Sequence, residues 1–143
     1  MDFLPLLREL ARSYQALESF SGSHVRSFGL TPPQFDLIAS LGNQPPMTCK
    51  ELGEKTLITK GTLTGVLDRL EDKGLIVRCA NSADARSQRV SLTVAGNDLF
   101  KEIFPKHIQY LSCAFNQISK NEMDQLTQSL KQLREAIEKT VEF

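Results

Sequence analysis

Residues 59–74 read TKGTLTGVLDRLEDKG, and the rest of the chain is best interpreted outward from them. The apolar residues recur in steps of three and four, which predicts one buried helix face made of Leu63, Val66, Leu67 and Leu70. We expect the Thr59 hydroxyl to cap the start of this helix and Gly74 to end it in a left-handed conformation.

The opposite face of this helix has an unusual composition. Its residues are cations, short hydroxyls and glycines, namely Lys60, Gly61, Thr62, Thr64, Gly65 and Arg69. Glycine and threonine favour helix less than the Glu and Lys that usually cover an exposed face. The helix is therefore either a loosely built surface helix or one that gives up stability so that a partner can approach closely.

Composition sets the broad class of the protein. The chain has 143 residues, of which 41% are hydrophobic and 24% charged, as expected for one globular domain. It contains neither an apolar run of about 18 residues nor a signal peptide, so we expect a cytoplasmic protein with no membrane partner. Its three cysteines have no metal-like spacing, and we expect neither a metal site nor a cofactor.

Charge is balanced overall but not along the chain. There are 17 cations and 17 anions, yet residues 58–93 hold six cations against four anions. The small positive excess thus falls around the helix of residues 59–74, where a nucleic-acid partner would need it.

The N-terminal half predicts helices. Apolar residues at helical spacing indicate a long amphipathic helix over about residues 4–27, which Gly29 ends. Thr31 and Gln34 can form a capping box for the next helix, whose buried face is Phe35, Leu37, Ile38 and Leu41.

A second capping box, Thr48 with Glu51, opens a helix of about two turns, and residues 56–58 turn into the helix of residues 59–74. This is a helix-turn-helix arrangement. Residues 75–79 and 89–92 are β-rich and predict a two-stranded hairpin, whose polar tip at residues 81–87 bears Asp84 and Arg86. The predicted fold is mainly α with a β-hairpin wing, a winged helix-turn-helix.

Two long helices follow the hairpin. Thr93 caps the first, which Pro105 should kink, and Ser119 with Glu122 caps the second. The N-terminal helix and the last helix each carry an apolar seam. The two seams could cover each other within one chain, but a homodimer explains them better.

The expected DNA-binding residues are those of the slim helix face and the wing. Gly61 and Gly65 permit close approach to the major groove, Thr62 and Thr64 can bond to bases or phosphates, and Lys60 and Arg69 supply charge. Arg86 would enter the flanking minor groove, with Asp84 pairing with it and aiming it.

The chain contains no catalytic motif, so we do not expect an enzyme. His24 and His107 stand alone in the sequence and are expected to be solvated or satisfied in the fold. Among the cysteines, only Cys49 lies at the start of a predicted helix beside a cation, Lys50, and an inert thiol is the expectation for each of the three.

The order of elements resembles the MarR family of transcriptional regulators over essentially the whole chain. The matching segments are LTPPQF (30–35), GTLTGVLDRLEDKGLI (61–76), DARS (84–87), VSLT (90–93) and Gly96. The resemblance implies one domain over residues 1–143, with a DNA-binding part at about 31–93 and dimerisation helices at 1–28 and 94–143.

The resemblance also implies a homodimer on a pseudo-palindromic DNA operator, usually a repressor, which a small-molecule effector releases. An effector cleft beside the dimerisation helices could use Tyr14, His24, Phe28 and Phe35, although such aromatic residues are more often plain core. Two alternatives remain. The protein could be an oxidant sensor using Cys49 or Cys113, but the first helix has Tyr14 without the cysteine of the peroxide-sensing branch. It could also be a winged-helix protein-interaction module.

Overall fold

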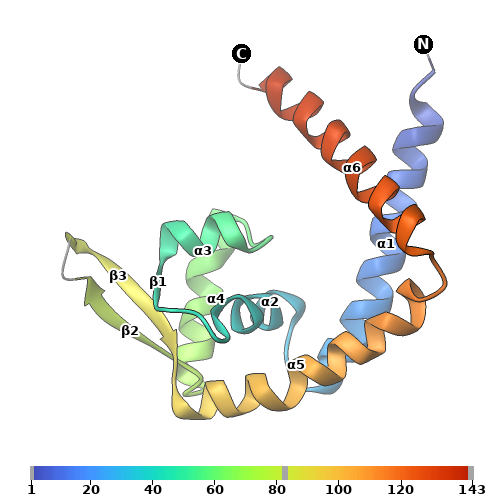
Figure 1. Ribbon diagram of the computed structural model, residues 1–143. Helices are drawn as coiled ribbons and strands as arrows, with labels where there is room; N and C mark the ends of the chain where they lie inside the picture. Colours follow the sequence, from blue (N-terminus) through green and yellow to red (C-terminus); the bar gives the residue numbers. More distant parts are fainter. Residues whose placement is uncertain (1, 82–83, 142–143) are drawn as a thin grey trace. The chain divides into compact units, whose positions relative to one another are not determined.

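The computed structural model describes the backbone of residues 2–81 and 84–141, and every side chain within these ranges except those of residues 81–86. The chain divides into two units, residues 1–108 and 109–143, which are described separately. Figure 1 shows the elements, which follow one another as α1 (Leu4–Ser27), α2 (Pro32–Leu41), β1 (Met47–Thr48), α3 (Cys49–Lys55), α4 (Lys60–Asp72), β2 (Ile76–Asn81), β3 (Asp84–Leu92), α5 (Val94–Phe115) and α6 (Lys120–Val141).

The junction between α1 and α2 forms as predicted. Gly29 follows α1 with φ 78°, a left-handed conformation that glycine adopts without steric cost. The capping box of α2 is complete, because the Gln34 amide donates to Thr31 Oγ1 at 3.4 Å and the Thr31 amide donates to Gln34 Oε1 at 3.1 Å. These local bonds fix where α2 begins.

The helix-turn-helix consists of α3 and α4, and its caps differ in part from prediction. Thr48 Oγ1 accepts from the Glu51 amide at 3.2 Å, but the reciprocal bond of a capping box is not among the contacts of the described residues. Thr59 occupies the N-cap position of α4, yet the predicted side-chain cap is wrong. Its hydroxyl instead donates to Thr62 Oγ1 at 2.9 Å, so the two hydroxyls satisfy each other.

The predicted hairpin is confirmed as β2 and β3, which pair antiparallel, and a third strand that the sequence analysis did not predict, β1, completes a sheet in the order β1-β3-β2. Met47 pairs with Val90 and Thr48 with Arg89, both antiparallel. Two residues are too few to show the alternation by which strands are recognised, and their pairing depends on β3 being alongside. The predicted tip was also too long, since β2 continues to Asn81 and β3 already begins at Asp84.

The core lies beneath α4. Its predicted stripe is fully buried, and it packs with residues of α2, α3, β1, β2, β3 and α5, including Leu37, Leu52, Met47, Ile76, Val90 and Phe100. Burial of the stripe settles which face of α4 points outward.

The start of α5 is fastened to the end of α4. Thr93 Oγ1 donates to the Gly74 carbonyl at 2.6 Å and accepts from the Gly96 amide at 3.1 Å, which confirms the predicted cap. A Cβ at Gly96 would lie 2.0 Å from the Leu75 carbonyl oxygen, so only glycine fits this contact. The residues that follow α4 and the residues that begin α5 are therefore held together, and this contact fixes the base of the wing.

The second unit contains the end of α5 and all of α6. Ser119 and Glu122 form the predicted capping box with both bonds at 3.1 Å. The seam of α6 is largely exposed in the single chain, as is that of α1. Helix α5 continues through Pro105, and the kink there stays a prediction. Within the described residues, no helix is both long enough and apolar enough to cross a lipid bilayer.

Candidate nucleic-acid interface

The outward face of α4 is slim, as its sequence predicted. Lys60, Gly61, Thr62 and Thr64 are exposed at its first turns, and Gly65 is half-buried. A Cβ built on Gly61 or Gly65 would meet no atom within 4 Å, and neither glycine has a positive φ. The fold itself therefore does not require glycine at either position.

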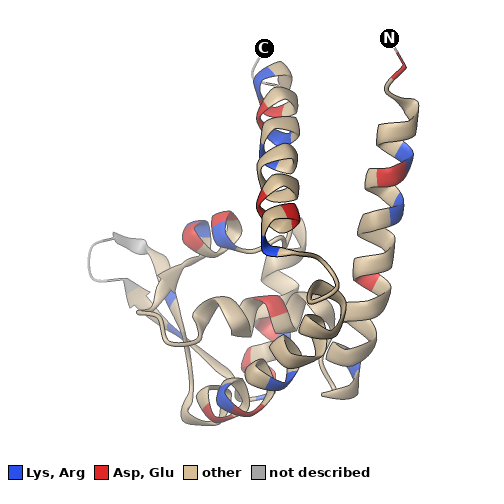
Figure 2. Cartoon of the chain, turned by 45° about the vertical axis from the view of Figure 1, so that its right-hand side comes forward, with Lys and Arg blue, Asp and Glu red and all other residues tan. Residues whose placement is uncertain are grey.

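The cations around α4 are a separate feature of the interface. Arg69 is exposed near the end of α4, and α3 presents Lys50 and Lys55 beside Glu51 and Glu54, a mixture of charges that Figure 2 shows. On α3 the cations and carboxylates balance. The positive charge that could attract a phosphate backbone therefore comes from separate side chains on α4, Lys60 and Arg69, and not from one continuous basic patch. Phosphate contacts of this kind weaken as salt concentration rises.

The C-terminal end of α4 is tied to the α1–α2 junction. Lys73 Nζ donates to the Gly29 carbonyl at 3.2 Å and to Gln34 Oε1 at 3.5 Å. The amide of Leu57, in the turn before α4, donates to Asp36 Oδ2 at 2.9 Å. Both ends of α4 are therefore fixed to α2 or to the junction that precedes it.

The predicted wing residues fall at the edge of the described structure. Asp84 and Arg86 have strand backbone at the start of β3, but their side chains lie outside the described residues. The pairing of Asp84 with Arg86 and the reach of Arg86 into a groove therefore stay predictions.

An ion-pair cluster that the sequence analysis missed links the wing to α4. Arg78 of β2 reaches Asp68 and Glu71 of α4, with N···O distances of 2.6 and 3.1 Å. The Arg78 guanidinium holds the pKa of the Glu71 carboxyl below its usual value. An arginine two positions after a buried residue in a strand, opposite a helix with two carboxylates, is the pattern that could have suggested it.

Three of the four predicted effector residues lie around a histidine pair. His24 of α1 and His107 of α5 are joined by their Nδ1 atoms at 2.9 Å, and Ser21 Oγ lies 3.1 Å from His107 Nε2. Phe28 contacts the His24 ring edge-on at 4.7 Å between centroids, and Phe35 contacts the His107 ring at 4.6 Å.

Tyr14 is not part of this cluster. Its hydroxyl bonds to Glu18 on the exposed side of α1, about 15 Å further along the helix from His24. The histidines, which stand alone in the sequence, satisfy each other only because α1 and α5 pack together. Burial, with a smaller contribution from the charge of His24, lowers the pKa of His107.

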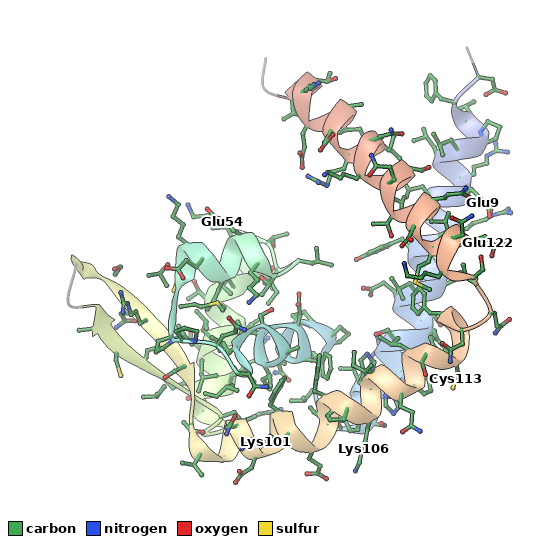
Figure 3. All side chains as sticks on the ribbon, viewed as in Figure 1. Glu9, Glu54, Lys101, Lys106, Cys113 and Glu122 are labelled. Atoms are coloured by element: carbon green, nitrogen blue, oxygen red, sulfur yellow. The ribbon has the colours of Figure 1, made fainter. Side chains whose placement is uncertain are left out.

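The cysteines lie on three different elements and all are exposed. Cys49 is the first residue of α3, Cys79 lies in β2, and Cys113 lies on α5, where Figure 3 labels it. Cys113 Sγ is 3.7 Å from the Gln109 carbonyl oxygen. The oxidant-sensing alternative stays a hypothesis on this evidence.

Comparison with known proteins identifies the class of protein that the sequence resembles. The model of the MarR family matches residues 30–88. The uncharacterised HTH-type transcriptional regulator YkoM of Bacillus subtilis is 32% identical over 126 residues, covering 88% of this chain and 82% of that protein.

Two solved structures share the fold. A MarR family regulator from Streptomyces coelicolor in complex with DNA has a TM-score of 0.84 at 21% identity, covering 92% of this chain and 84% of that one. BpsR of Bordetella bronchiseptica, whose DNA binding is regulated by 6-hydroxynicotinic acid, has a TM-score of 0.82 at 24% identity, covering 94% and 96%.

Proposed function

The chain belongs to the MarR family of DNA-binding transcriptional regulators, which are not enzymes, and from this premise we propose that it is a homodimeric repressor. It binds a pseudo-palindromic operator through α4 and the wing of each subunit, and a small-molecule effector releases it. Its site of action is the bacterial cytoplasm, where the chromosome is accessible.

The observation that carries this proposal is the open space over Gly61 and Gly65. The buried stripe of α4 turns these glycines outward, where a Cβ would touch nothing in the chain. A helix that enters the major groove brings its N-terminal residues against base edges, and small residues there allow close approach. Lys60, Thr62 and Thr64 then lie at the edge of the same surface as charge and hydrogen-bonding groups.

The dimer and the effector rest on further features. The exposed apolar seams of α1 and α6 would be covered by a second copy of the chain, which is how exposed apolar faces of this kind are usually explained. The cluster of His24, Phe28, Phe35 and His107 brings several aromatic rings together, and such rings suit an effector that is itself aromatic. The regulator of BpsR, 6-hydroxynicotinic acid, is aromatic, and we extend that mode of control to this chain.

The test begins with a DNA duplex that the wild-type protein selects from a random-sequence library. Its affinity and that of a scrambled duplex are measured by fluorescence anisotropy at several salt concentrations. We expect the selected duplex to bind tighter, and binding to weaken as salt rises. Arg86→Ala should weaken binding of the selected duplex roughly tenfold, the effect of losing one specific groove contact.

The matched control is Lys101→Ala, which removes an exposed cation of α5, labelled in Figure 3, away from the proposed interface. It should leave the affinity unchanged. A protein that binds both duplexes equally, or not at all, would contradict the proposal and favour the protein-interaction module instead. Equal effects of Arg86→Ala and Lys101→Ala would contradict the role of the wing.

A further inference from the structure

The wing and the recognition helix α4 are joined by one arginine and two carboxylates. Arg78 Nη2 lies 2.6 Å from Asp68 Oδ1 and 3.1 Å from Glu71 Oε1, and Arg78 Nε lies 3.1 Å from Glu71 Oε2. The Arg78 side chain is 19% exposed, against 57% for Asp68 and 44% for Glu71. Two elements that contact DNA in the proposed function are thus bridged by a largely covered guanidinium.

Strand periodicity explains why Arg78 faces α4. Alternate residues of a strand point to the same side, and Ile76, two residues earlier, is buried in the core beneath α4. Val77 and Cys79, on the other side of β2, are exposed. Arg78 therefore continues the contact between β2 and α4 outward from the point where the apolar core ends.

The charge of this cluster does not favour DNA. Asp68 follows Gly61 and Gly65 by seven and three positions, so it continues the same face of α4. Together the three side chains carry a net charge of −1, because one guanidinium meets two carboxylates. A cluster that served only to attract phosphate would not contain Asp68 and Glu71, so its benefit must come from geometry.

We propose that Arg78 is a positioning residue for operator recognition, acting through Asp68 and Glu71. It holds the wing at one distance and angle from α4, so that the wing meets the flanking minor groove while α4 occupies the major groove. A hairpin is marginally stable by itself, and fixing it before binding lowers the ordering cost at the complex. This inference rests on the proposed function, since it needs both elements to touch DNA.

Asp68→Asn tests the inference because charge and geometry predict opposite results. Removing a carboxylate near DNA should tighten binding to any sequence if only charge matters. If the carboxylate positions the wing, affinity for the selected duplex should fall about fivefold, the factor for one ion pair of this kind. Affinity for the scrambled duplex should be unchanged or higher.

Asp72→Asn is the matched control. It makes the same charge change on the same helix, and Asp72 forms no ion pair or side-chain hydrogen bond within the described part of the chain. We expect it to leave the preference for the selected duplex unchanged. Thermal unfolding of each variant, followed by circular dichroism, checks that the fold is retained.

Two further variants separate positioning from a merely structural role. In an Arg86→Ala background the wing contact is already lost, so Asp68→Asn should have little additional effect on the selected duplex. Arg78→Lys keeps the charge but cannot bridge both carboxylates, and it should reduce the preference for the selected duplex less than Arg78→Met does.

The outcomes are distinct. Tighter binding of both duplexes by Asp68→Asn, or an effect that persists in full beside Arg86→Ala, overturns the positioning role while leaving the proposed function intact. A wild-type protein that does not distinguish the two duplexes overturns the proposed function first, and the inference with it.

Discussion

Gly65 lies within α4, where alanine would favour the helix by about 1 kcal/mol. Its backbone has no positive φ, and an added Cβ would meet no atom within 4 Å. The residue is therefore suboptimal for the folded chain and understandable only if something outside the chain comes close. If stability were the only requirement, alanine would be the better residue at position 65, so we attribute the glycine to function.

Gly65→Ala should raise the free energy of unfolding by about 1 kcal/mol, because alanine restricts the unfolded chain and favours helix. The same substitution should weaken binding of the selected duplex, because its methyl group occupies the space next to the bases. Chemical denaturation gives the first quantity and fluorescence anisotropy the second.

The control is Gly53→Ala in α3, where an added Cβ also meets nothing within 4 Å. This variant should be as stable as Gly65→Ala or nearly so, with unchanged affinity for DNA. If Gly65→Ala binds DNA as well as the wild type, close approach at this position is not needed, and the interpretation of the slim face is wrong.

At the scale of elements, the histidine pair joins α1 to α5. His107 is 3% exposed and its Nδ1 shares one hydrogen bond with His24 Nδ1, so one ring donates and the other accepts. Two protonated rings could not keep this bond, because both Nδ1 atoms would then carry hydrogen. The packing of α1 on α5 is thereby linked to pH.

The sign follows from the lowered pKa of His107 in the folded chain. The unfolded chain takes up a proton near the ordinary histidine pKa of about 6.5, whereas the folded chain resists it. The contribution of His107 to the free energy of unfolding is therefore fully present above that pH and declines as the pH falls below it. The melting temperature should drop between pH 7.5 and 5.5, and His107→Asn, although less stable overall, should lose part of this dependence.

An unchanged pH dependence in His107→Asn would assign the effect to other titrating groups. Operator affinity measured across the same pH range tests whether the junction of α1 with α5 also influences DNA binding. A parallel decline of affinity in the wild type but not in the variant would support that link.

At the scale of the whole molecule, the single chain leaves apolar residues of two helices uncovered. Leu7, Leu10 and Leu17 of α1 and Leu126, Leu130 and Ile137 of α6 are all exposed by a third or more. Helix α6 buries none of its described residues in the single chain. Such helices need a partner, and in the proposed homodimer a second copy of the chain would cover them.

Leu130→Glu should therefore shift the protein from dimer to monomer, because a carboxylate on the seam would lose its hydration in the interface. Sedimentation equilibrium measures the mass directly. Gln132→Glu adds the same charge at an exposed position off the seam and should leave the dimer intact. A wild-type protein that sediments as a monomer would contradict the proposed dimer. It would also contradict a pseudo-palindromic operator with one half for each subunit.

The extent of successful prediction differs between the helices and the candidate site. The buried stripe of α4, the ends of α1 and the capping boxes at Thr31 and Ser119 were predictable, because each depends on residues within about four positions. The cap at Thr59 was predicted wrongly, since its hydroxyl found the neighbouring Thr62 hydroxyl instead of a free amide. The residues on the outward face of α4 could be predicted from the sequence. Only the tertiary structure shows that a Cβ at Gly61 or Gly65 would meet no other atom of the chain.

The sequence by itself determined the helical periods, most of their ends, the winged helix-turn-helix order and the family. The tertiary structure alone decided the pairing of β1 with β3, the contact of His24 with His107 and the bridge from Arg78 to Asp68 and Glu71. The physical reason is range. Helix periodicity and caps arise from neighbours along the chain, whereas His24 and His107 are 83 positions apart and meet only because the folded core brings their helices together.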